Sequence, residues 1–140
     1  MATHLYGAWL LAMRGDPEGS RARAAACEAI AERVGYPLIG LHAALLAAWA
    51  AALLGDPEAV ARADDAYARC ADSGVLLFVP FYLLLRAEAH VVAGHPDQAA
   101  ALVTEAAARS AELGDVCRAP RLIALSDEFA AMSTQGVRKP

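Results

Sequence analysis

Apolar residues recur at helical spacing along most of the chain. Two examples run through Val60, Ala63, Tyr67 and Cys70, and through Ala99, Leu102, Val103, Ala106 and Leu113. Such steps place these side chains on one face of a helix, whereas no segment alternates long enough to predict a strand. The pattern predicts an all-α fold with helices at about 3–14, 17–34, 38–54, 57–73, 79–93, 96–113 and 119–132.

Three turns between these helices share one design. They read Gly15-Asp16-Pro17-Glu18, Gly55-Asp56-Pro57-Glu58 and Gly94-His95-Pro96-Asp97. Glycine enters the left-handed conformation that ends a helix, aspartate caps the next helix, and proline suits its first position. In the third turn histidine replaces the aspartate, so we expect a weaker cap there.

The turns repeat with a period of about 40 residues. Gly15, Gly55 and Gly94 are 40 and 39 residues apart, and a second set, Gly35, Gly74 and Gly114, has spacings of 39 and 40. Two alternating turns at one period indicate two helices per repeat. We therefore expect about three and a half helix-turn-helix repeats in one domain, residues 1–132, followed by a flexible tail at 133–140.

Composition and charge limit the classes of protein to which the chain can belong. Hydrophobic residues make up 58% of the 140, aromatic residues only 6%, and the formal net charge is −4. The basic residues are scattered, which argues against direct nucleic-acid binding. The odd number of cysteines, three, argues against a disulfide framework and favours a cytoplasmic setting. The uncharged stretch 36–55 contains proline, glycine and histidine, and a buried helix explains it better than a membrane span.

The repeat resembles the tetratricopeptide unit, a helix-turn-helix motif with glycine in the turn. It differs in being longer than 34 residues and in having Leu11, Ala51 and His90 where tyrosine is usual. The longer unit is similar to the C-terminal sensor arrays of MalT-like and LuxR-type bacterial transcriptional activators. The resemblance implies a right-handed α-solenoid that serves as the sensor or scaffold part of a transcription regulator.

In tetratricopeptide stacks the first helix of each pair lines a concave groove. Carried over by register, that implies a groove formed by Leu5, Trp9, Met13, His42, Leu45, Trp49, Phe81, Leu84, Glu88 and Arg121. This face is strongly apolar, and three explanations stay open. It is closed core, it receives an amphipathic helix from another copy or another protein, or it binds a small apolar ligand oriented by His42, Glu88 and Arg121.

No catalytic constellation, metal-ligand pattern or cofactor motif emerges from the residues. We therefore expect no enzyme activity, no metal and no cofactor. The leading hypothesis is a protein-interaction or self-association module, as a homodimer or as part of a larger regulator. A sensor of an apolar or acidic metabolite is the alternative.

Overall fold

The computed structural model describes residues 1–74 and 78–114, together with Ala124 and Asp127. Within these residues it contains six α-helices and no strand, which confirms the all-α prediction. The helices are α1 (Ala2–Met13), α2 (Pro17–Val34), α3 (Pro37–Leu53), α4 (Ala59–Asp72), α5 (Val79–Val92) and α6 (Pro96–Leu113). The predicted helix at 119–132 lies outside the described residues except for Ala124 and Asp127, which are both helical, and so does the predicted tail.

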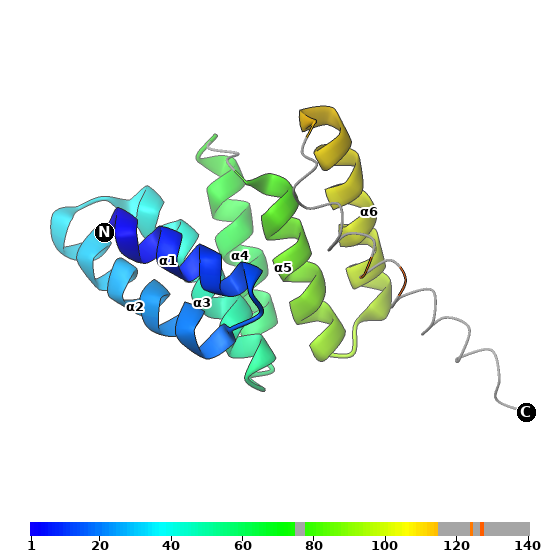
Figure 1. The fold of residues 1–140 in the computed structure, drawn as a ribbon, viewed down its shortest axis with the longest axis horizontal. Helices are drawn as coiled ribbons and strands as arrows, with labels where there is room; N and C mark the ends of the chain where they lie inside the picture. The colour runs from blue at the N-terminus through cyan, green and yellow to red at the C-terminus, as the bar shows by residue number, and fades with distance from the viewer. Residues whose placement is uncertain (75–77, 115–123, 125–126, 128–140) are drawn as a thin grey trace, which may run out of the picture. The chain divides into compact units, whose positions relative to one another are not determined.

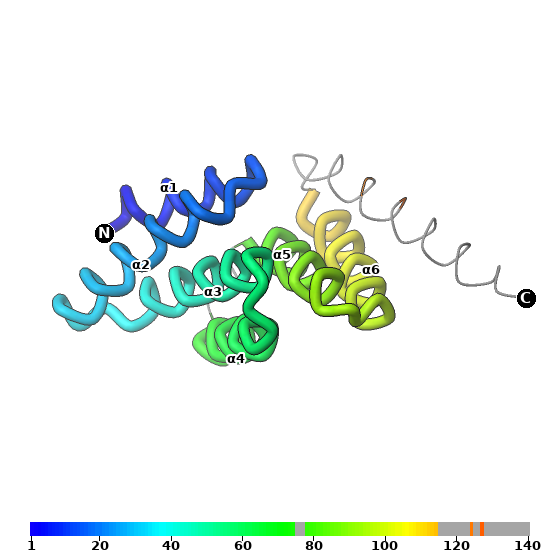
Figure 2. The backbone as a smooth tube through the Cα atoms, turned by 90° about the horizontal axis from the view of Figure 1, so that it is seen from below, coloured from blue at the N-terminus to red at the C-terminus, as the bar shows by residue number. Residues whose placement is uncertain are grey.

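The chain divides into two compact units, Met1–Leu77 and Phe78–Pro140. In the first unit α3 packs against α1, α2 and α4 (Figures 1 and 2). In the second, α5 and α6 form an antiparallel pair (Figure 1). The solenoid arrangement and the repeat number remain predictions.

The turns adopt the geometry that their residues favour. All six turn glycines have positive φ angles, between 64° and 96°. The Asp16 side chain caps α2 by accepting a hydrogen bond of 2.9 Å from the Gly19 amide. His95 begins α6 without a side-chain cap, which agrees with the weaker cap expected there.

The turn before α4 departs from the prediction. The helix begins at Ala59 instead of residue 57, because residues 57–58 form a further turn. Asp56 accepts a hydrogen bond from the Glu58 amide at 3.0 Å, so its carboxylate stabilises this turn instead of capping the helix directly. Pro57 consequently lies before the helix.

Alanine and serine allow the helices of the first unit to approach closely. The hydroxyl of Ser20, which is fully buried, donates to the carbonyl of Ala8 at 3.0 Å and ties α2 to α1. At the contact between α2 and α3, a Cβ built on Gly40 would lie 3.6 Å from the Cβ of Ala31. The largest side chains of this core, Leu45, Leu46 and Trp49, all come from α3 and are fully buried.

Candidate functional site

The predicted groove residues differ widely in exposure. Leu45, Trp49 and Leu84 are fully buried, and Phe81 and His42 nearly so. Leu5, Trp9 and Glu88 are half-buried, Met13 is 44% exposed, and Arg121 lies outside the described residues. The burial of the α3 and α5 residues is what the closed-core explanation expects of this face.

The three residues expected to orient a small ligand are not brought together within the described residues. His42 belongs to the first unit and Glu88 to the second, while Arg121 falls outside the described part. The His42 imidazole lies in the core, with its Nδ1 atom 3.9 Å from the Cys70 sulfur. Burial lowers the pKa of His42 and raises that of the Cys70 thiol. Both groups are therefore neutral core groups at pH 7.

A different surface of the first unit is concave. A cavity of about 650 Å³ lies over α3 and is flanked by α2 and α4. We call it the alanine groove, because one face of α3 supplies Ala44, Ala47, Ala48 and Ala51. The flanking helices contribute Arg21, Glu28, Ala61, Arg62, Asp65, Ala66 and Arg69.

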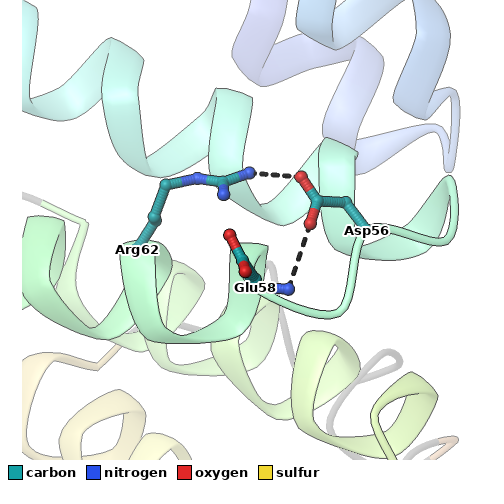
Figure 3. Close-up of polar contacts among 3 residues, drawn as sticks. All are labelled: Asp56, Glu58 and Arg62. Carbon is teal, nitrogen blue, oxygen red and sulfur yellow. Dashed lines mark hydrogen bonds and ion pairs between the residues drawn. The ribbon is translucent and has the colours of Figure 1, made fainter.

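The α4 side of the alanine groove carries two ion pairs. Arg62 binds Asp56 with an N–O distance of 2.6 Å, and Asp56 also accepts from the Glu58 amide (Figure 3). The hydrogen bond from Arg62 holds the pKa of Asp56 below its usual range. Arg69 lies 3.7 Å from Asp65. All four side chains of these pairs are largely exposed, so a ligand can compete for the arginines at small cost.

The α2 side carries two charges without an ion pair among the described residues. Arg21 and Glu28 are seven residues apart and therefore on the same face of the helix. Glu28 is half-buried, and this burial raises the pKa of its carboxyl group. Three arginines and two carboxylates thus line the groove, which makes it more basic than a chain whose net charge is −4.

Helix α1 carries a separate exposed stripe of apolar side chains. Tyr6, Leu10 and Met13 are 54%, 57% and 44% exposed, and their spacing of four and three residues places them on one side of the helix. Two of the predicted groove residues, Leu5 and Trp9, lie beside this stripe in sequence and are half-buried.

Sequence reasoning missed the alanine groove. The tetratricopeptide resemblance directed attention to the first helix of each pair, whereas the flanks of the groove come from the second helices, α2 and α4. A signal was nevertheless present, because the four floor alanines follow steps of three, one and three residues, which is a helical stripe.

Comparisons with known proteins do not assign the chain. No protein-family model, no curated protein and no solved structure matches it. Across the described residues, no three histidine, cysteine, aspartate or glutamate side chains are grouped to hold a metal ion. None of the helices in that part combines the length and the apolar character that crossing a membrane requires.

Proposed function

We propose that this chain is a non-enzymatic protein-interaction module that binds a partner helix in the alanine groove. The observation that carries the proposal is the groove itself, a floor of alanine methyl groups between two charged helices. Small side chains on a floor allow another helix to approach closely, and the flanking charges fix its register and direction.

The chemistry of the groove suits a protein better than a small molecule. Pockets for small ligands are mostly apolar and enclose most of the ligand, with a few polar groups that orient it. Here the uncharged residues that line the cavity are all alanines, and the charged side chains on its α4 side belong to exposed ion pairs. A surface of this kind resembles the centre and rim of a protein interface.

A role in transcription regulation remains part of the proposal. It rests on the resemblance of the repeat to the sensor arrays of bacterial activators. A protein-binding groove would serve a regulator by docking another of its modules or a second protein.

Site-specific photo-crosslinking tests the proposal. A benzophenone amino acid at Ala47, on the groove floor, should yield a discrete crosslinked protein whose contact site is a helical segment, identified by mass spectrometry. The same probe at Ala25, which is exposed on α2 and does not line the groove, is the matched control. Equal crosslinking from the two positions, or none from Ala47, would contradict the proposal.

A further inference from the structure

Helix α6 of this chain has an exposed face of small and acidic side chains. The outer face of α6 presents Ala101, Thr104, Ala108 and Ala111, all exposed. Their spacing of three, four and three residues makes a continuous stripe of small side chains. The Thr104 hydroxyl is satisfied by the carbonyl of Ala100 at 3.0 Å within its own helix. This face of α6, like the groove floor, therefore consists of small side chains.

The charges beside that stripe are complementary to those of the groove. Glu105 and Glu112 are exposed on α6 and seven residues apart, which corresponds to about 10.5 Å along the helix. Arg62 and Arg69 on α4 have the same separation of seven residues. Two acids along one helix can thus meet two arginines along the other. Arg62, Arg69 and Glu112 would leave or share exposed ion pairs to make these contacts, among them Arg109–Glu112 at 3.1 Å.

The net charge of the groove lining also favours α6 as the bound helix. The groove is lined by three arginines and two carboxylates. Asp65 already pairs with Arg69, and Asp56, just outside the lining, pairs with Arg62, so an acidic partner would share these two arginines. The partner helix should therefore be acidic and rich in small residues. The outer face of α6 meets both conditions.

We infer that the alanine groove of one copy binds α6 of a second copy, with Glu105 and Glu112 facing Arg62 and Arg69. This inference rests on the proposed function and names its partner. The contact joins different surfaces on the two copies, so association is not limited to a dimer and larger species should form at high concentration.

The test exchanges the charges at the proposed contact in the full chain. The readout is the solution mass, measured by light scattering over a range of concentrations. The wild-type protein should exceed the monomer mass of 14.6 kDa as concentration rises. The variant E105R/E112R changes only exposed side chains and should remain at the monomer mass, with at least a tenfold weaker association. The variant R62E/R69E should behave in the same way.

Mixing these two variants is the decisive experiment, because it tests whether the two surfaces contact each other. The arginines of one α6 then meet the glutamates of the other groove, and the unchanged surfaces also match, so association should return. Recovery also shows that both variants are folded. The matched control E18R/E32R makes the same charge change at exposed positions of α2 that do not line the groove, and it should associate like the wild type.

Three outcomes would overturn the inference. They are a wild-type protein that stays monomeric at every concentration, an E105R/E112R variant that associates like the wild type, and a mixture that does not recover. If Leu10→Lys alone abolished association, the exposed stripe of α1 would be the contact instead. A monomeric wild type whose Ala47 probe still captures a helix of another protein would leave the proposed function standing.

Discussion

The Nδ1 atoms of His90 and His95 lie 3.3 Å apart at the turn between α5 and α6. The His95 amide also donates to the His90 carbonyl at 2.9 Å. The same backbone bond joins Asp16 to Leu11 and Asp56 to Ala51, at 2.9 and 3.0 Å. The third turn therefore keeps the backbone geometry of the other two and differs in the two side chains that this bond brings together.

Restoring the aspartate should strengthen this turn. In His95→Asp, the carboxylate can accept from a free amide in the first turn of α6, as Asp16 does from Gly19. We expect the free energy of unfolding to rise by about 0.5–1 kcal/mol, the usual value of such a cap, as measured by urea unfolding.

Removing the aspartate cap of the first turn provides the control. Asp16→Ala removes the hydrogen bond to Gly19 and should cost about 1 kcal/mol in the same measurement. If His95→Asp were neutral or destabilising while Asp16→Ala behaved as expected, the contact between His90 and His95 would itself stabilise the turn.

Trp49 is the largest fully buried side chain of the chain's described part, and it tests whether the predicted groove face is core. Trp49→Ala should lower the free energy of unfolding by about 3–5 kcal/mol, because it leaves a large cavity in the first unit. Thermal and urea unfolding measure the loss. Tyr36→Ala, at a side chain that is 52% exposed, is the control and should change stability by less than about 0.5 kcal/mol. A small effect of Trp49→Ala would favour an open groove.

The helices could be predicted from the sequence because their limits are encoded locally. Prolines at the first helical position and glycines at or just after the C-cap predicted the ends of α2, α3 and α6 to within one residue. The start of α4 was two residues wrong. A carboxylate that follows a glycine can cap a helix or stabilise a preceding turn, and Asp56 does the second with the help of Arg62. Arg62 is six residues away in sequence, so no local rule includes it.

The candidate site was harder to predict because α3 is apolar on all sides, so its sequence does not show which side is exposed to solvent. His42, Leu45 and Trp49 are the prominent side chains, and they attracted the functional hypothesis, yet they are buried. The alanines on the other side form the groove floor because α2 and α4 lie on both flanks without covering it. Which face remains open depends on the packing of the neighbouring helices, and residue identity alone does not determine it.

Acid should destabilise the chain through His42. Burial lowers the pKa of this imidazole in the folded state. Below the pKa of about 6.5 in the unfolded chain, His42 therefore binds a proton more readily in the unfolded state than in the folded state. The free energy of unfolding should therefore fall as pH drops from 7.5 to 5.5, by at most about 1.4 kcal/mol per pH unit for one proton. His42→Gln should flatten this dependence in urea unfolding at both pH values. An unchanged slope in the variant would assign the acid sensitivity to another group.

The half-buried carboxylate of Glu28 should destabilise the folded chain at neutral pH. Burial raises the pKa of its carboxyl group, so ionisation disfavours the folded state above the folded pKa, and this cost vanishes below the unfolded value of about 4.3. Glu28→Gln should therefore stabilise the chain at pH 7.5, with a smaller gain at pH 4. Glu32→Gln, at an exposed position of the same helix, is the matched control and should show neither effect. Urea unfolding under dilute conditions keeps association out of the measurement. A gain of equal size at both pH values would mean that the amide stabilises the site by hydrogen bonding and that the buried charge is not the cause.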